Sequence, residues 1–276
     1  MYRKIKDSRD SEALQKDIDR LCNWEKRWQM KFNRAKCYAM HITNKKKVIE
    51  TNYRIGGSIL ETVTNHTYLG VAFDNKLRWS SHIQNITSKG YQILGLLRRN
   101  MYSCTPNVKA IAYKTLVRPR LEYCASVWDP YQKDLISQLE AVQRRSARFV
   151  MKNSEQRASV TEMLQHLKWE SLQHRRATQR LSLIYKSVHK LVAVDTDPYL
   201  TKSIEDGVVT RKCASISFNK VTTAKDCYKY SLFPRSFAEW NCLASEVRNA
   251  PTIKSFKSKL NADNLELIIN KAHFRN

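Results

Sequence analysis

Close pairs of carboxylates are the first residues of this sequence that could do chemistry, because two held together can bind the metal pair of a nucleotidyl-transfer enzyme. The nearest candidates are Asp17 with Asp19, Asp195 with Asp197, and Glu205 with Asp206. The first pair is two residues apart in a predicted helix, so its members point to different faces. The other two pairs fall at a predicted helix end and in a predicted turn. We interpret all three as solvated or capping carboxylates, and we predict no catalytic residue and no metal site in this chain.

Histidine, cysteine and glycine give no stronger candidate for catalysis. The seven cysteines are scattered without a CxxC pair, and none of the seven histidines has the spacing of a zinc finger. The only neighbouring glycines are Gly56 and Gly57, so a glycine-rich phosphate loop is absent from the sequence. Scattered cysteines in odd number indicate reduced thiols, and therefore an intracellular protein.

Clusters of basic residues on predicted helices give the clearest functional signal. They are Arg98 and Arg99, then Arg118 and Arg120, then Arg144, Arg145, Arg148 and Lys152, and finally Arg175 and Arg176. Guanidinium groups bind phosphate bidentately, so such faces can hold a sugar-phosphate backbone without reading its bases. The alternative for each cluster is a merely solvated helix face. Tyr68, Tyr113 and Tyr123 could stack on bases, although aromatic residues at such spacing more often pack in a core.

The overall charge favours the same partner. The chain carries 49 Lys and Arg against 25 Asp and Glu, a formal net charge of +24, and every successive block of fifty residues is positive. A protein so charged repels itself unless a polyanion supplies counter-charge, and nucleic acid is the expected polyanion. No apolar stretch approaches the roughly 17 residues that cross a bilayer, and the N-terminus has no signal-peptide pattern. We therefore expect an intracellular protein, nuclear or cytoplasmic, that is neither secreted nor membrane-bound.

Composition predicts a mainly α-helical chain. Six glycines and six prolines in 276 residues are well below ordinary usage of about 12% together, which leaves few turns for a many-stranded fold. The length fits one large domain or two small ones. A small antiparallel sheet is predicted over residues 37–73, with an extended segment at 37–43, a tight hairpin at 53–60 around Gly56-Gly57 and a strand at 68–73.

Periodicity and capping signals place the helices. Leu14, Ile18, Leu21, Trp24 and Trp28 form one apolar face of a helix that starts at Asp10, with Glu25 intruding on it. Further helices are predicted around 83–97, from Pro106, over 133–152, from the capping box at 159–162, over 169–188, around 233–243 and over 253–260. In the helix at 133–152, Leu135, Leu139, Val142 and Phe149 make a core face opposite the basic cluster. Residues 199–229 are the predicted linker.

Several strings, in order from about residue 10 to residue 260, resemble the reverse transcriptase of non-LTR (LINE-type) retrotransposons, most closely the jockey and chicken-repeat groups. Among them are Trp28-Gln29-Met30-Lys31-Phe32-Asn33, Tyr68-Leu69-Gly70-Val71, Tyr113-Lys114-Thr115-Leu116-Val117-Arg118-Pro119, Val127-Trp128-Asp129-Pro130, Leu139-Glu140-Ala141-Val142-Gln143-Arg144-Arg145 and Phe233-Pro234-Arg235. The resemblance implies three regions: a palm remnant with the primer-grip hairpin at 1–78, a helical thumb at 79–155 and a C-terminal helical region at 156–276. It also implies that Lys36 lies near the incoming triphosphate and that Tyr68, Leu69, Gly70 and Val71 form the primer grip. The thumb would lay one face along an RNA or RNA/DNA template-primer.

The sequence also departs from the family pattern. In such polymerases the metal-binding aspartates lie on two palm motifs, and the second motif comes just before the hydrophobic-Tyr pair that Met1-Tyr2 resembles. The resemblance therefore implies that the Mg²⁺ of the parent polymerase has no ligands here, and we expect no cofactor. We expect a 5′-truncated product that binds template-primer without polymerising on its own, with the upstream palm and fingers of a complete element as a further partner. One alternative is a helical interaction or scaffold protein derived from a mobile element, with no nucleic-acid role. Another is an enzyme that uses Asp17 or Asp206.

Overall fold

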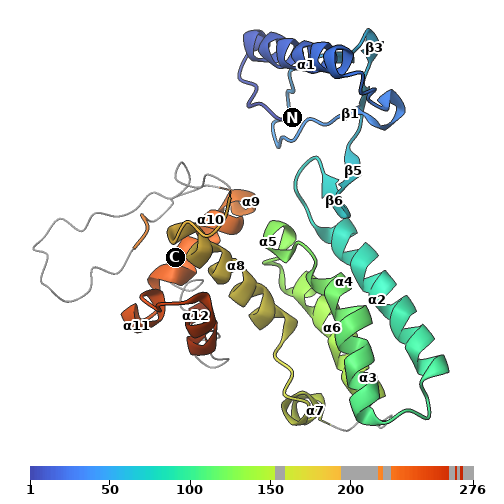
Figure 1. The fold of residues 1–276 in the computed structure, drawn as a ribbon, viewed down its shortest axis with the longest axis vertical. Helices are drawn as coiled ribbons and strands as arrows, with labels where there is room; N and C mark the ends of the chain where they lie inside the picture. Colours follow the sequence, from blue (N-terminus) through green and yellow to red (C-terminus); the bar gives the residue numbers. More distant parts are fainter. Residues whose placement is uncertain (153–158, 194–216, 220–224, 261–264, 266–267, 270–276) are drawn as a thin grey trace, which may run out of the picture. The chain divides into compact units, whose positions relative to one another are not determined.

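The computed structural model describes residues 1–152, 159–193, 217–219, 225–260, 265 and 268–269. The chain divides into two compact units, Met1–Ser81 and His82–Asn276 (Figure 1). The described part is mainly helical with a few short strands, so the predicted fold class is confirmed. Among these residues, no helix is long and apolar enough to cross a membrane.

Unit 1 begins with helix α1 (Ser8–Trp28), which starts where the side chain of Asp7 accepts a hydrogen bond from the backbone N–H of Asp10. Its buried residues are Ser11, Ile18, Cys22 and Glu25. The predicted core face is therefore wrong for Trp24 and Trp28, which are 42% and 61% exposed. Glu25 lies on the buried face of α1 in place of these tryptophans. Its burial is explained by its partners, because its carboxylate accepts a hydrogen bond from the Phe32 backbone N–H at 2.8 Å and lies 3.7 Å from the Arg34 guanidinium.

The rest of unit 1 is a set of short strands. They are β1 (Tyr38–Ala39), β2 (Arg54–Ile55), β3 (Ser58–Ile59), β4 (Glu61–Thr62), β5 (Asn65–Tyr68) and β6 (Val71–Asp74), with a 3₁₀ turn η1 (Arg34–Lys36) before β1. The hairpin β2–β3 confirms the prediction at Gly56-Gly57, whose φ angles of +54° and +87° suit a primed turn. The single antiparallel sheet over 37–73 is wrong, because these strands form three separate pairs and β1 pairs with β4 in parallel. The strand at 68–73 is wrong as well: it is the β5–β6 hairpin, turning at Leu69 and Gly70.

A small apolar cluster joins α1 to these strands. Ile18 and Cys22 pack with Tyr53 and Ile55. The side-chain amide of Gln15 closes the contact, since it both donates to the Arg54 carbonyl and accepts from the Arg54 N–H, at 2.8 and 2.9 Å. Among the described residues this cluster has only four buried members, so unit 1 has a thin core.

Unit 2 begins inside the first turn of α2 (Ser80–Asn100). The helices that follow are α3 (Pro106–Ala112), η2 (Tyr113–Val117), α4 (Arg118–Glu122), α5 (Ala125–Trp128) and α6 (Lys133–Val150). η2 is a π-helical turn, and Pro119 explains it: proline has no N–H to donate to the carbonyl four residues earlier, and the Arg118 N–H bonds back to Tyr113 instead. α2 lies close to α4 and α6 at Gly90, where an added Cβ would come within 3.2–3.3 Å of Val142 and Leu121.

Helix α7 (Val160–His166) packs on α6, and the helices that follow form a second core. They are α8 (Leu172–Val188), α9 (Asp226–Lys229), α10 (Leu232–Asn241), α11 (Ser245–Arg248) and α12 (Ile253–Lys259). The predicted capping box is confirmed, with the Ser159 side chain accepting from the Glu162 N–H. Leu181, Tyr185, Trp240 and Phe256 pack at the centre of this core. Most of the predicted linker at 199–229 lies outside the described residues.

Candidate nucleic-acid interface

Helix α6 has one apolar and one cationic face, as the sequence predicts. Leu135, Leu139 and Val142 are 4%, 0% and 0% exposed, and Arg145 is exposed on the other side. The helix ends at Val150, and Lys152 follows in a left-handed conformation with φ +52°. Phe149 is a correction: it is half-buried and belongs to the cationic side rather than to the core face. Its spacing of four from Arg145 and three from Lys152 already places it there.

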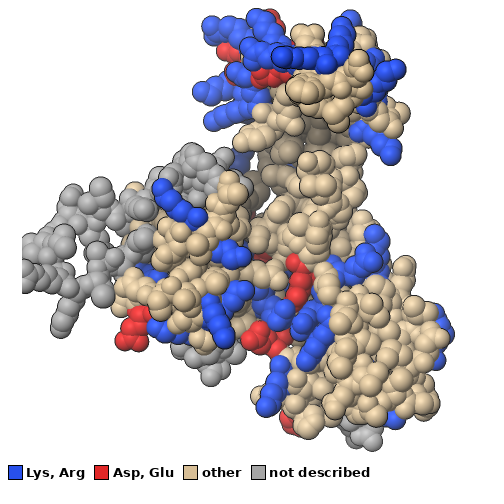
Figure 2. Space-filling model, viewed as in Figure 1, with Lys and Arg blue, Asp and Glu red and all other residues tan. Residues whose placement is uncertain are grey.

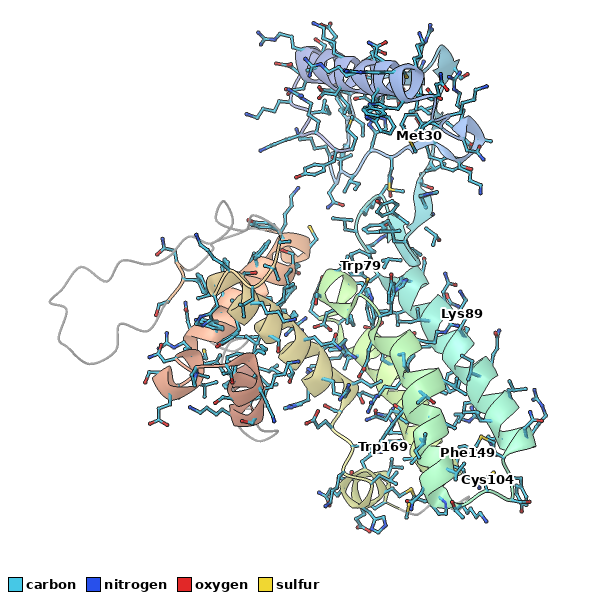
Figure 3. All side chains as sticks on the ribbon, viewed as in Figure 1. Met30, Trp79, Lys89, Cys104, Phe149 and Trp169 are labelled. Atoms are coloured by element: carbon cyan, nitrogen blue, oxygen red, sulfur yellow. The ribbon has the colours of Figure 1, made fainter. Side chains whose placement is uncertain are left out.

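A concave pocket of about 620 Å³ lies between α2, α3 and α6, and we call it the cationic pocket. It is lined by Arg98, Tyr102, Lys109, Ala141, Arg144, Arg145, Arg148, Phe149 and Lys152. The predicted cationic cluster of α6 thus meets Arg98 from the end of α2. Six cations line the pocket, and its lining includes no Asp or Glu among the residues that the structure describes. Phe149 and Cys104, labelled in Figure 3, mark the end of the helix bundle where the pocket lies.

Lys109 also lines the cationic pocket, and no spacing in the sequence predicts it. It is 1% exposed, donates a hydrogen bond to the Tyr102 carbonyl at 2.9 Å, and lies 5.1 Å from the centre of the Phe149 ring and 5.9 Å from that of Tyr102. Loss of solvation lowers the pKa of Lys109, and the positive charge of Lys152 lowers it further. An anion in the pocket would relieve this repulsion.

The contacts that hold Arg144, Arg145 and Arg148 in the described part of the chain include no carboxylate. The Arg145 guanidinium lies 5.6 Å from the centre of the Tyr91 ring, and Arg144 Nη2 donates to the Ser137 carbonyl at 3.4 Å. Arg148 Nε is buried and has no hydrogen-bond partner among the described residues. The pocket therefore offers a fixed positive charge to a phosphate.

Arg175 and Arg176 serve a different purpose, although the sequence places them with the binding residues. Arg175 donates to both carboxylate oxygens of Glu122, and this hydrogen bonding raises the pKa of Arg175. Arg176 is 0% exposed, and its Nε lies 2.6 Å from Asp129 Oδ1. A fully buried guanidinium cannot reach an external phosphate, so Arg176 leaves the candidate interface.

Arg176 belongs to a set that we call the buried arginine cluster: Arg176, Arg180, Arg235, Asp129 and Glu239. Each of these side chains is at most 5% exposed. Arg180 Nη2 lies 2.6 Å from Glu239 Oε1 and also contacts Asp129, and Arg235 lies within 3.4 Å of both carboxylates. Burial lowers the pKa of both Arg176 and Arg180 to about 10. The cluster links α8 and α10 to the end of α5.

Sequence comparison finds relatives of the chain among RNA-directed DNA polymerases. It is 26% identical over 145 residues to a probable RNA-directed DNA polymerase from transposon BS of Drosophila melanogaster. It is 27% identical over 146 residues to the RNA-directed DNA polymerase from mobile element jockey of Drosophila funebris, and 26% identical over 143 residues to that of Drosophila melanogaster. The chain is a relative of jockey-type, non-LTR retrotransposon polymerases. The match takes in about half of the chain, 49–50%, but only 15–16% of each relative.

No family model matches the chain, and no solved structure matches it. The relationship to the jockey-type polymerases therefore comes from sequence alone. It agrees with the family resemblance carried by the motifs. The roles of single residues, and the division into regions 1–78, 79–155 and 156–276, stay predictions.

The residues that the resemblance assigns to the palm all lie in unit 1. Lys36 ends η1 and is exposed. The predicted primer-grip residues form the β5–β6 turn, where Tyr68 and Leu69 are 63% and 71% exposed and Val71 is 3% exposed. The tip of this hairpin therefore presents an aromatic and an aliphatic side chain to solvent.

The other predicted contact residues are distributed over unit 2. Arg99 and Arg120 are exposed, and Arg118 Nε lies 3.9 Å from Glu122. Tyr123 is 55% exposed. Tyr113 is a core residue: it is fully buried, donates to Gln143 Oε1 at 2.8 Å and stacks on Trp169, and burial raises its pKa well above the ordinary value.

Proposed function

We propose that this chain is the template-primer-binding part of a non-LTR retrotransposon reverse transcriptase. It binds RNA or an RNA/DNA duplex through phosphate contacts on the helices of unit 2. The observation that carries the proposal is the cationic pocket, in which six Lys and Arg side chains from three segments converge without a carboxylate. Figure 2 shows Lys and Arg side chains projecting from both units with fewer Asp and Glu between them, which extends the attraction for a polyanion beyond the pocket.

Salt dependence tests this function, because each phosphate that the protein neutralises releases a counterion. Lys109 is 1% exposed, so five cations of the pocket are open to a ligand. If these five meet phosphates, the affinity for duplex falls roughly 500-fold between about 50 and 200 mM salt. Binding of a labelled RNA/DNA duplex, measured by fluorescence anisotropy over this range, should show that fall with little dependence on base sequence. Flat salt dependence, or no binding at 50 mM salt, would instead favour the interaction or scaffold protein.

A triple variant identifies the surface responsible. Changing Arg144, Arg145 and Arg148 to Ala should weaken duplex binding and reduce the slope of log K against log salt by about 2.7, since three phosphate contacts are lost. The matched control changes the exposed Lys45, Lys46 and Lys47 to Ala, which removes the same charge from unit 1. Equal losses in the two variants would mean that general charge, and not the pocket, binds the duplex.

We also propose that the isolated chain polymerises nothing. In the described residues no three His, Cys, Asp or Glu side chains are placed to hold a metal ion. Asp17 is engaged by Arg3 and Arg20, at 3.1 and 2.9 Å, while Asp19 accepts from Gln15, so the two carboxylates do not face a common site. Primer extension with Mg²⁺ and all four nucleotides should give no product. Extension by the isolated chain would overturn the proposal, and its loss in Asp17→Asn would identify Asp17 as a catalytic residue.

A further inference from the structure

We infer that the cationic pocket takes one unpaired nucleotide at the end of the bound nucleic acid, with its base on Tyr102, while the α6 cations hold its phosphate and the neighbouring phosphates of the strand. The inference rests on the proposed function and deepens it. It names the chemical unit that this part of the interface recognises: a nucleoside monophosphate at the end of a strand, rather than the side of a duplex.

The shape of the pocket is the first support. A duplex presents a broad sugar-phosphate surface with its bases stacked inside, and this surface can lie across a pocket but cannot fill it. A volume of about 620 Å³ falls in the range of sites for small ligands, roughly 300–1,000 Å³. A single nucleotide that leaves the base stack is the part of a nucleic acid that has this size.

One wall of the pocket suits a phosphate. Arg144 and Arg148 are four residues apart and so lie on the same side of α6. Lys152 follows just after the end of this helix, and Arg98 contributes a fourth cation from α2. Arg148 also lines this wall, and its buried Nε has no hydrogen-bond partner in the described part of the chain. The repulsion between Lys109 and Lys152 falls when an anion binds between them.

The other wall suits a base. Tyr102 lines the pocket and is 79% exposed, so the fold does not use this ring for its core. Lys109 fixes the position of Tyr102 by bonding to its carbonyl, and its ammonium group lies on one side of the ring. The exposed face of the ring is left for stacking, an interaction that every base can make and that does not depend on sequence.

Duplexes with and without a one-nucleotide overhang test the inference. The overhang carries 2-aminopurine, whose fluorescence is quenched on stacking. The wild-type chain should bind an overhang duplex about 5- to 150-fold more tightly than a blunt duplex of the same length, and should quench the probe, because stacking on an aromatic side chain contributes that much per base. Tyr102→Ala should lose both the preference and the quenching while still binding the blunt duplex.

Matched variants and a competitor separate the outcomes. Tyr102→Phe keeps the ring and should keep the preference, and Tyr228→Ala, at a 55% exposed tyrosine outside the pocket, should change nothing. Salt-dependent binding of both duplexes with equal affinity overturns the inference and leaves the proposed function standing. No binding of either duplex overturns the proposed function. Inorganic tripolyphosphate that displaces the overhang from wild type and from Tyr102→Ala with equal effect shows a phosphate-only pocket, which also overturns the inference.

Discussion

Removing the charge of Asp129 should destabilise unit 2 by about 3–5 kcal/mol. Asp129 is the carboxylate that Arg176 contacts, and it also contacts Arg180 and Arg235. Asp129→Asn leaves three buried guanidinium groups facing the single carboxylate of Glu239, and an uncompensated charge in such a place costs about this amount. The Arg176 side chain has no exposed surface through which water could replace the lost partner.

Thermal unfolding followed by circular dichroism measures the effect. For a unit of the size of residues 82–276, each kcal/mol shifts Tm by roughly 2–4 °C, so we expect a fall of about 6–20 °C. Glu170→Gln is the matched control, because Glu170 lies within 4 Å of His174 and Arg175 but is 49% exposed, and such pairs contribute about 0–1 kcal/mol.

A second substitution tests the cause of the loss. Combining Asp129→Asn with Arg176→Met replaces the unpaired cation with an apolar side chain of similar length, and should restore part of the stability. If Asp129→Asn lowers Tm no more than Glu170→Gln does, the buried arginine cluster does not hold this unit together.

Three further predictions follow from burial and packing. His82 is 3% exposed, and burial, with a smaller effect of Lys89, lowers its pKa to about 4. Because the unfolded chain binds the proton more readily, the free energy of unfolding of unit 2 should fall by up to about 3 kcal/mol as the pH falls from 6.5 to 4. Urea titrations over that range should show a smaller fall for His82→Gln. Gly90→Leu should cost about 1–3 kcal/mol in the same assay, because its side chain would overlap Val142 and Leu121, whereas Gly95→Leu, whose nearest neighbour is the flexible end of an arginine, should cost less. Hydrogen exchange should show weaker protection in unit 1 than in unit 2, and equal protection would contradict the thin core described for unit 1.

Features set by local chemistry could be predicted from the sequence. The Gly56-Gly57 turn needs only two residues that tolerate positive φ, and the start of α7 needs only Ser159 and Glu162 three positions apart. The two faces of α6 come from a period of 3.6 residues, which is visible without knowledge of any partner. Each of these depends on neighbours within one or two turns of chain.

Features set by a distant partner could not be predicted. Arg175 and Arg176 are adjacent and chemically identical, but they have different partners. Arg175 is partly exposed and pairs with Glu122, whereas Arg176 is buried and pairs with Asp129. The inward face of α1 is turned by a hydrogen bond between Glu25 and Phe32. Lys109 joins the cationic pocket because α3 packs on α6, and no spacing within α3 records that.

The presence of a carboxylate distinguishes the two ways in which this chain uses arginine, and this makes binding and stability separable. Arginines of the buried arginine cluster are neutralised inside the protein, so their loss should lower Tm and leave the salt dependence of duplex binding unchanged. Those of the cationic pocket repel one another in the free protein, so Arg144→Ala and Arg148→Ala should weaken binding while Tm stays constant or rises. If Arg144→Ala or Arg148→Ala unfolds at a lower temperature than wild type, the replaced arginine stabilises the fold, and this prediction is refuted.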